Sequence, residues 1–371
     1  MTIRLLGVSA ALVDGALLPG DVEVDGDTVT RVGLPPAAGG RIATPGLLDL
    51  QVNGFAEVDV MAADVDGIDR IGTALTDHGV TAWLPTLITA ADADTRRALG
   101  VLRTAIDRGT PGAQPLGVHL EGPFLSPARL GTHPAVHRRE PDPAVLEEWR
   151  ALAPVVAVTL APELPGAVDV VAKLSADGVL VSLGHSDATA AQAHAGFDAG
   201  ARTATHLFNA MSALRHRDPG LPGAALARPD VTVQLIVDGH HLADDVVRLV
   251  FAAARGRVVL VTDATEAAAR EEGEYEIAGV PVEVRAGAVR NGAGVLAGSA
   301  LTLDAAVRNV VGLGIDLAEV LTAVTATPAA LIGRPDLGRL APGARADLVV
   351  LEDDLTVRET WLAGTPVART A

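Results

Sequence analysis

Eight stretches of apolar residues recur through the middle of the chain, and most are followed by a segment with helical periodicity. They span residues 41–54, 80–89, 115–124, 154–163, 179–187, 202–210, 231–241 and 258–265. Continuous apolar strands that alternate with helices are typical of a buried parallel sheet. We therefore predict an α/β protein with a (β/α)8 TIM-like barrel. A doubly wound open sheet is the alternative, but no glycine-rich phosphate-binding sequence follows the first stretch.

The two ends of the chain have a different pattern, with short alternating segments separated by turn residues. Residues 21–33 alternate around Asp25-Gly26, which predicts a β-hairpin. The segment from residue 338 onward has the same character. We expect residues 1–44 and 336–371 to form one small β-sandwich domain together, and residues 45–335 to form the barrel inserted between them.

Composition limits the chemistry and the partners of the chain. Cysteine is absent, so a metal would have to be held by His, Asp or Glu. The formal net charge is −17 and Lys173 is the one lysine, which argues against binding to nucleic acid or to an acidic membrane. The N-terminus lacks the plan of a signal peptide, and no uncharged apolar run of about 18 residues is present. We therefore expect a cytoplasmic protein.

Polar side chains follow the ends of several expected strands. In a (β/α)8 barrel the carboxyl ends of the strands meet at one face, where the chemistry takes place. The residues at these ends are Gln51, Asn53, Glu121, His185, His206, Asp238, His240, His241 and Asp263. Acids and imidazoles from different strands are thus expected to share one site. Directly after His185, the pair Ser186-Asp187 predicts the start of a helix.

Glu121, His185 and His206 are the first candidates for metal ligands. A single histidine at a strand end is more often structural, but His185 and His206 end successive strands. Glu121 follows an apolar strand and precedes Gly-Pro, so once buried it needs a partner or a cation. One carboxylate and two imidazoles leave an open position on a tetrahedral zinc ion, which is the arrangement of a hydrolytic site.

Other polar residues each have two interpretations. Asp263 is either the N-cap of a following helix or a proton carrier beside the metal, and its place at the barrel mouth favours the second. His119 either supports the site or belongs to the core. Arg217 is either a surface charge or an anion clamp, with His241 and Asn209 near the same anion. The remaining histidines are expected at the surface or in loops: His78, His137, His194 and His216.

Seven motifs together resemble those of N-acetylglucosamine-6-phosphate deacetylases, which belong to the amidohydrolase superfamily. The segments are "TPGLLDLQVNG", "GVHLEGPFLSP", "LGHSDAT", "THLFNAM", "VDGHH", "VTDAT" and "LAGSALTL", and they occur in the same order over nearly the whole chain. The resemblance implies metal-dependent hydrolysis of the acetamide of N-acetyl-D-glucosamine 6-phosphate. The products would be glucosamine 6-phosphate and acetate, in amino-sugar catabolism or cell-wall recycling.

The resemblance also implies roles for individual residues. Glu121, His185 and His206 match the metal ligands, and Asp263 matches the general base and acid. The positions that match substrate contacts are Thr132, His133, Asn209, Ala210, Arg217, Asp238, His241, Leu296, Ala297 and Gly298. In the family the residue equivalent to Arg217 reaches the substrate phosphate in the neighbouring subunit, which implies a homodimer.

The first strand departs from the superfamily pattern. In the superfamily the first strand commonly ends in His-x-His, which holds a second metal. In this chain the same positions are Gln51-Val52-Asn53. Neutral amides are weak ligands for zinc-like cations beside imidazoles. One branch of the deacetylase family shares the Gln-x-Asn pattern and resembles a single-metal enzyme. We therefore expect one divalent ion per subunit, zinc before iron, cobalt or cadmium.

Two other functions stay open on the sequence alone. One is a deacetylase for another acylated amino-sugar phosphate, such as N-acetylgalactosamine 6-phosphate, because a single hydroxyl contact separates the epimers. The other is a catalytically silent binding protein built on an amidohydrolase-like barrel, to which the missing His-x-His gives weight. The retained acids and imidazoles argue against the silent protein, and about one tightly held ion per chain would decide between the two.

Overall fold

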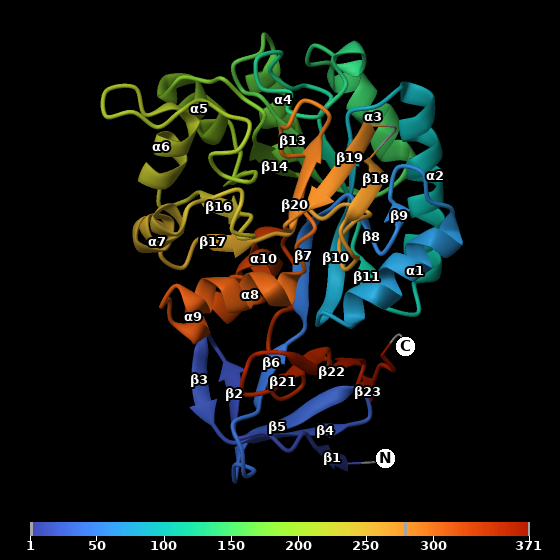
Figure 1. The fold of residues 1–371 in the computed structure, drawn as a ribbon, viewed down its shortest axis with the longest axis vertical. Coiled ribbons are helices and arrows are strands. Elements are labelled where there is room, and N and C mark those ends of the chain that lie inside the picture. The colour runs from blue at the N-terminus through green and yellow to red at the C-terminus, as the bar shows by residue number, and fades with distance from the viewer. Residues whose placement is uncertain (1–2, 278–279, 370–371) are drawn as a thin grey trace.

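The centre of the protein is a parallel barrel of eight strands, seen in a computed structural model that describes residues 3–277 and 280–369 (Figure 1). Its strands are β7 (Leu47–Val52), β10 (Val80–Ile88), β12 (Val118–Glu121), β13 (Val155–Leu160), β14 (Leu180–Leu183), β15 (Thr203–Ala204), β16 (Thr232–Leu235) and β17 (Val258–Leu260). A two-residue strand, β11 (Gln114–Pro115), adds to the edge of β10. The predicted barrel is confirmed.

The barrel closes where the segment after β17 lies against β7. The Asp263 N–H donates to the Gln51 carbonyl over 3.0 Å. One residue earlier, the hydroxyl and the N–H of Thr262 donate to the Asp49 carboxylate over 2.6 and 3.2 Å. Asp49 is fully buried, which raises its pKa to about 7. These contacts fix the position of Asp263 beside the end of the first barrel strand.

Helices cover the outside of the barrel, and Val, Leu and Ala residues fill most of the shared core. The helices are α1 (Val65–Thr76), α2 (Asp92–Arg108), α3 (Pro143–Leu152), α4 (Ala167–Ala176), α5 (Ala190–Asp198), α6 (Gly220–Ala227), α7 (Asp244–Ala253), α8 (Leu303–Gly312), α9 (Leu317–Thr322) and α10 (Ala326–Leu331). A 3-10 helix, η1 (Ala135–His137), precedes α3. Within the described ranges, none of the helices combines the length and the apolar character required to cross a membrane.

The prediction that a helix starts at Ser186-Asp187 is wrong. Helix α5 begins later, at a capping box in which Thr189 and Gln192 satisfy each other's backbone N–H groups. The Ser186 hydroxyl and the Asp187 N–H instead donate to the Glu163 carboxylate, over 2.7 and 2.6 Å. The two polar groups that would cap a helix are bound by a carboxylate from another loop. The segment after His185 is therefore an ordered loop and not the first turn of a helix.

The two chain ends form two sheets that pack face to face, as the sequence predicts; they lie at the lower end of Figure 1. One sheet contains β2 (Ala10–Val13), β3 (Ala16–Pro19), β6 (Ile42–Pro45), β21 (Leu348–Leu351), β22 (Val357–Leu362) and β23 (Thr365–Pro366). The other contains β1 (Ile3–Leu5), β4 (Asp21–Asp25) and β5 (Thr28–Leu34). Val22, Val24, Leu348 and Trp361 belong to their common core.

The first apolar stretch is divided between the end sheet and the barrel. Its first part is β6, which pairs with β21, and its second part is β7, which pairs with β10. Gly46 joins the two strands at a close approach, because a Cβ atom there would lie 2.0 Å from the Thr81 hydroxyl oxygen. The chain therefore passes from one core to the other at Gly46.

A second group of strands, not predicted from the sequence, lies between β17 and α8. It is an antiparallel sheet of β18 (Gly273–Ile277), β19 (Val280–Arg285) and β20 (Ala288–Asn291). A small hairpin, β8 (Gly54–Phe55) and β9 (Val58–Asp59), follows the first barrel strand. In Figure 1 the three-stranded sheet stands in front of the barrel strands.

His78 lies in the turn after α1, as the sequence analysis expected of a surface or loop residue, and it contacts Asp304 of α8. His78 Nδ1 lies 3.0 Å from Asp304 Oδ1, and Arg308 donates to Oδ2 over 2.8 Å. The Asp304 side chain is only 9% exposed. Burial alone would raise the pKa of Asp304, but hydrogen bonds from His78, Thr302 and Arg308 hold it well below its usual range.

We expect Asp304→Ala to lower the free energy of unfolding by about 2 kcal/mol at pH 7, because a buried carboxylate bound to three donors is lost. Since the folded state lowers this pKa, the stabilisation is present above about pH 4 and is lost as the pH falls further. Urea unfolding of both proteins from pH 3 to pH 8 measures it. Asp245→Ala is the control, since the Asp245 side chain is 96% exposed and, among the described residues, forms an ion pair with Arg248 alone. Equal losses for both variants at pH 7 would contradict the assignment.

Candidate active site

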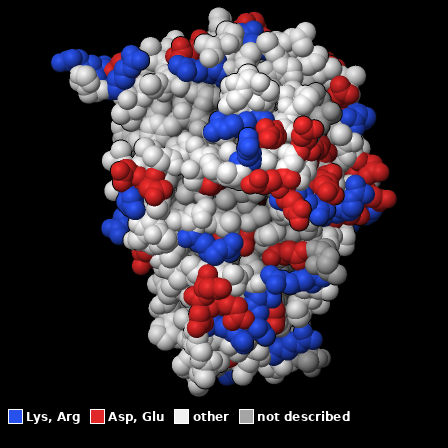
Figure 2. All heavy atoms as spheres, in the orientation of Figure 1, with Lys and Arg blue, Asp and Glu red and all other residues white. Residues whose placement is uncertain are grey.

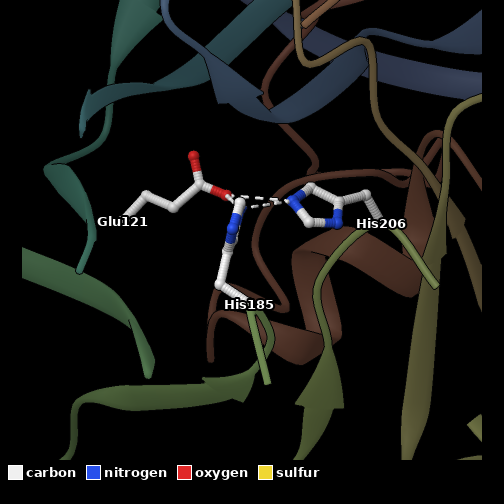
Figure 3. A group of neighbouring side chains, drawn as sticks. All are labelled: Glu121, His185 and His206. Carbon is white, nitrogen blue, oxygen red and sulfur yellow. Dashed lines mark hydrogen bonds and ion pairs between the residues drawn. The ribbon is translucent and has the colours of Figure 1, made fainter. Parts of the chain in front are cut away.

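Glu121, His185 and His206 converge at the carboxyl end of the barrel (Figure 3). Glu121 ends β12, His185 follows β14 and His206 follows β15. His185 Nε2 and His206 Nε2 lie 3.2 and 3.0 Å from the same carboxylate oxygen of Glu121, and 3.1 Å from each other. All three side chains are buried. The structure thus brings together all three residues that the sequence predicts as metal ligands.

The hydrogen bonds of this group fit a cation between the three side chains. His185 Nδ1 lies 2.8 Å from the Arg129 carbonyl, which can only accept, so the ring proton belongs on Nδ1 and Nε2 keeps its lone pair. That lone pair faces a carboxylate oxygen of Glu121, and two acceptors in contact repel each other unless a cation lies between them. Separations of 3.0–3.2 Å suit ligand atoms around an ion with bonds of about 2.0–2.2 Å. The three residues can therefore hold a metal ion.

Electrostatics keep the Glu121 carboxylate charged. Burial alone would raise its pKa, but the surrounding imidazoles, above all that of His133, lower it well below its usual range. A buried anion of this kind needs a compensating positive charge. The carboxylate is therefore available as a ligand rather than as a proton donor.

Three site residues have backbone conformations that non-glycine residues rarely adopt. The φ angles of His185, His206 and Asp263 are 46°, 31° and 50°. Each left-handed residue of this kind costs on the order of 1–3 kcal/mol, and such residues concentrate at functional sites. The tight turns after β14, β15 and β17 therefore direct these side chains to a common point at the expense of local stability.

Asp263 lies beside the metal-ligand group and is held by two amides. Asn53 Nδ2 and Gln51 Nε2 donate to Asp263 Oδ1 over 2.6 and 3.0 Å, and Gln51 Nε2 also lies 3.1 Å from Glu121 Oε1. Burial and the nearby charge of Glu121 raise the pKa of Asp263 to about 6. A carboxyl group with such a pKa can accept and return a proton near neutral pH. The alternative role as an N-cap does not apply, because no helix begins at Asp263.

His133 adds a proton donor next to the metal-ligand group. The Thr89 N–H donates to His133 Nδ1 over 3.3 Å, so the ring proton belongs on Nε2. His133 Nε2 lies 3.7 Å from Glu121 Oε2. Burial and the neighbouring His185 lower the pKa of His133 to about 4, so the imidazole is neutral. A neutral ring with its N–H toward the site suits a contact to a substrate oxygen.

His119 belongs to a polar layer below the site rather than to the metal-ligand group. Its two ring nitrogens lie 3.2 Å from the Thr86 hydroxyl and 2.8 Å from the Thr159 hydroxyl, and Thr159 is 2.8 Å from the Thr205 hydroxyl. Burial lowers the pKa of His119 to about 4. The core interpretation of His119 fits these contacts.

A cavity of about 450 Å³ opens above these residues. Most of the residues predicted from the sequence line it: Glu121, Thr132, His133, His185, His206, Asn209, Ala210, His241, Asp263, Leu296, Ala297 and Gly298. Gly298 makes a close approach possible, since its φ is +58° and a Cβ atom there would lie 2.8 Å from the Asp263 carbonyl oxygen. The cavity is large enough for a monosaccharide-sized ligand.

Two predicted substrate residues, Asp238 and Arg217, do not line this cavity. Asp238 Oδ2 lies 2.7 Å from His241 Nδ1, and Asp238 also accepts from the His241 N–H over 2.9 Å. Asp238 therefore orients His241. Arg217 is exposed in the loop between β15 and α6. Lys and Arg side chains project at the upper left of Figure 2, over this part of the molecule, where the loop contains Arg215 and Arg217.

The sequence analysis missed two arginines of the cavity wall. Arg129 comes from the loop after β12, and Arg290 comes from β20. Most arginines are solvated surface residues, so residue type alone did not distinguish these two from the other arginines of the chain. The alternation of valines with charged residues over 280–291 is the signal that would have placed Arg290 on a strand.

The chain is similar to known proteins over most of its length. Residues 42–367 match the family model of the amidohydrolase family. An N-acetylgalactosamine-6-phosphate deacetylase from Escherichia coli O157:H7 is 41% identical over 328 residues, which cover 87% of this chain and 87% of that protein. An N-acetylglucosamine-6-phosphate deacetylase from Vibrio furnissii is 36% identical over 324 residues, which cover 86% of this chain and 81% of that protein.

A solved structure extends the similarity to nearly the whole fold. The crystal structure of N-acetyl-D-glucosamine-6-phosphate deacetylase from Mycobacterium smegmatis superposes with a TM-score of 0.93 at 35% sequence identity. The match covers 98% of this chain and 100% of that one. The resemblance in the sequence motifs is thereby confirmed. The chain belongs to the amidohydrolase family.

Proposed function

We propose that this protein hydrolyses the acetamide of N-acetyl-D-glucosamine 6-phosphate to glucosamine 6-phosphate and acetate. The observation that supports it most is the meeting of one carboxylate oxygen and two imidazole Nε2 atoms, 3.0–3.2 Å apart, beside Asp263. Two deacetylases of amino-sugar phosphates are 36–41% identical to the chain. The enzyme holds one divalent ion per subunit, with zinc as the first candidate because imidazole and carboxylate suit it.

The chain's own residues divide the chemistry between them. Glu121, His185 and His206 would hold a divalent ion, which would lower the pKa of a water molecule and polarise the amide carbonyl. Asp263 takes a proton from the attacking water and returns it to the nitrogen of the departing amine. Gln51 and Asn53 both donate to Asp263 Oδ1, which leaves Oδ2 for the proton. The nitrogens of these two amides face the acids, so both side chains act as hydrogen-bond donors to them.

The cavity wall positions the sugar. His133, His241 and the segments 209–210 and 296–298 all line the cavity. The phosphate is remote from the bond that breaks, so binding it can align the amide with the reacting groups. Charged phosphorylated sugars do not cross membranes unaided, so the enzyme works in the cytoplasm, where such sugars are retained.

Arg217 acts across a homodimer, on the substrate phosphate in the neighbouring subunit. It is exposed on a projecting loop and does not line the cavity of its own chain. Guanidinium groups bind phosphate with two parallel hydrogen bonds. We expect Arg217→Ala to raise the KM for the phosphorylated sugar about 10- to 100-fold and to leave the metal content unchanged.

Mixing two impaired variants tests whether Arg217 acts in trans. A heterodimer of Arg217→Ala with Asp263→Asn has one site with an intact Asp263 and an intact partner Arg217. Activity at low substrate concentration should therefore reappear after subunit exchange, above the sum of the separate variants. No recovery in a mixture shown to contain heterodimers would overturn the assignment.

A second substrate is supported by a specific observation. The relative that is 41% identical is an N-acetylgalactosamine-6-phosphate deacetylase. Acetate release from the gluco and galacto sugars, each with and without phosphate, decides the substrate when elemental analysis of the protein is done alongside. Our proposal predicts release from the phosphorylated gluco sugar, with about one divalent ion per chain. Release from the galacto epimer alone would replace the substrate, and no release from either would refute the function.

A further inference from the structure

The two arginines on the cavity wall differ in what holds them. Arg129 pairs with Asp187, with its Nε 2.8 Å from Oδ1, and its carbonyl holds His185 Nδ1. Arg129 is therefore occupied by contacts within the chain. Arg290 donates to the Gly294 carbonyl over 2.8 Å, and over residues 3–277 and 280–369 no ion pair joins it to a carboxylate. Its positive charge is thus available to a ligand in the cavity.

The three-stranded sheet determines where the Arg290 side chain points. Val284 and Val289 form a cross-strand pair and lie in a small hydrophobic core with Ala297. Arg290 follows Val289 in β20, so its side chain leaves the opposite face of the sheet. Arg290 and Gly294 both line the cavity. The bond to Gly294 therefore holds the guanidinium at the cavity edge.

The charges around the cavity create a need for such a cation. Glu121 and Asp263 lie in its wall, and the whole chain carries a formal net charge of −17. An anionic ligand would be repelled by this field unless a local positive group opposed it. Figure 2 shows Lys and Arg side chains over β19 and β20, where the chain supplies Arg285 and Arg290. Glu283 is the cross-strand neighbour of Arg290 but forms no ion pair with it in the described part of the chain.

We propose that Arg290 binds the phosphate of the sugar substrate from within the same chain. The inference rests on the proposed function and assigns part of its phosphate recognition to a residue in cis, in addition to the partner subunit's Arg217. Arg290 takes no part in the metal-ligand group and does not contact Asp263. Its loss should therefore weaken the binding of phosphorylated sugars more than it slows the bond-breaking step.

The test uses Arg290→Ala and Arg290→Lys, with Arg285→Ala as the matched control from the same sheet, since Arg285 is exposed and does not line the cavity. KM and kcat are measured with the acetylated sugar in phosphorylated and plain form, and calorimetry gives the Kd of glucosamine 6-phosphate. We expect Arg290→Ala to raise KM and Kd for the phosphorylated sugars about 10-fold or more, with kcat within about threefold. Arg290→Lys should retain part of the affinity, and Arg285→Ala should match the wild type.

An unchanged Kd for glucosamine 6-phosphate in Arg290→Ala overturns the inference. Equal losses for the phosphorylated and the plain sugar also overturn it, because they would show a contact to the ring rather than to the phosphate. If the wild type releases no acetate from any phosphorylated sugar, the proposed function fails separately. The calorimetric comparison then still decides the role of Arg290.

Discussion

Replacing Asp263 by asparagine should lower kcat for acetate release by about 10³- to 10⁴-fold and leave the metal content of the protein unchanged. General acid and base groups contribute about 10²- to 10⁴-fold each, and here one carboxyl group serves in both directions. Asparagine can still accept the hydrogen bonds of Gln51 and Asn53 but cannot carry the proton. The KM for the phosphorylated sugar should change little, because the cavity wall that binds the sugar is intact.

The measurement for Asp263 is acetate release under saturating substrate, together with elemental analysis of the same sample. Asp142→Asn is the matched control, since Asp142 caps the exposed start of α3 and asparagine also caps helices. It should retain full activity. Turnover within tenfold of the wild type for Asp263→Asn would remove Asp263 from the mechanism.

Removing one ligand should abolish stoichiometric metal binding. His206 Nε2 lies 3.0 Å from Glu121 Oε1, within the predicted ligand group. His206→Ala therefore removes one of three ligands and leaves one imidazole and one carboxylate. We expect the variant to retain far less than one ion per chain after dialysis and to lose activity by at least about 10³-fold. Inductively coupled plasma mass spectrometry and the acetate assay measure both effects.

The control for His206 is His194→Ala on the outer helix α5, which should bind metal as the wild type does. Treatment of the wild type with a chelator should give the same loss, and addition of zinc, iron(II), cobalt or cadmium should then identify the metal that restores activity. A His206→Ala protein that keeps one ion per chain would show that the ion binds elsewhere.

The barrel and the metal-ligand group could be predicted because strong local patterns identify them. Eight apolar stretches separated by helical segments leave few arrangements other than a barrel, and polar residues at their ends must then meet at one face. His185 and His206 lie 64 and 85 positions after Glu121 in the sequence. Each of the three residues is nevertheless at or just after the end of a barrel strand. The positions of these residues at strand ends therefore predicted that they meet, although they are far apart in the sequence.

Other parts of the site depend on contacts that no local pattern encodes. Helix α5 begins only at Ala190, after its N-cap Thr189, and Glu163 from a different loop binds Ser186 and Asp187 instead. His78 is held by Asp304, 226 positions away. Competition of this kind between tertiary and local hydrogen bonds becomes visible only once the fold brings the partners together.

The inserted sheet shows a third limit. Apolar and polar residues alternate over residues 280–291, as in a β-hairpin. The predicted barrel does not include such a hairpin, and Arg290 was not predicted as a site residue. Val284 and Val289 of the sheet pack against Ala267 and Ala297 in a small hydrophobic core. This packing holds the sheet against the barrel, where it forms a wall of the cavity. An insertion between the last barrel strand and its helix can therefore add a functional residue without disturbing the barrel pattern.

The most direct measurement of the central claim is an anomalous-scattering map from crystals of the metal-loaded protein. We predict one strong peak per chain, about 2.0–2.2 Å from a Glu121 carboxylate oxygen, His185 Nε2 and His206 Nε2. A peak at any other place, or protein that holds one ion per chain with no peak between these three side chains, would contradict it.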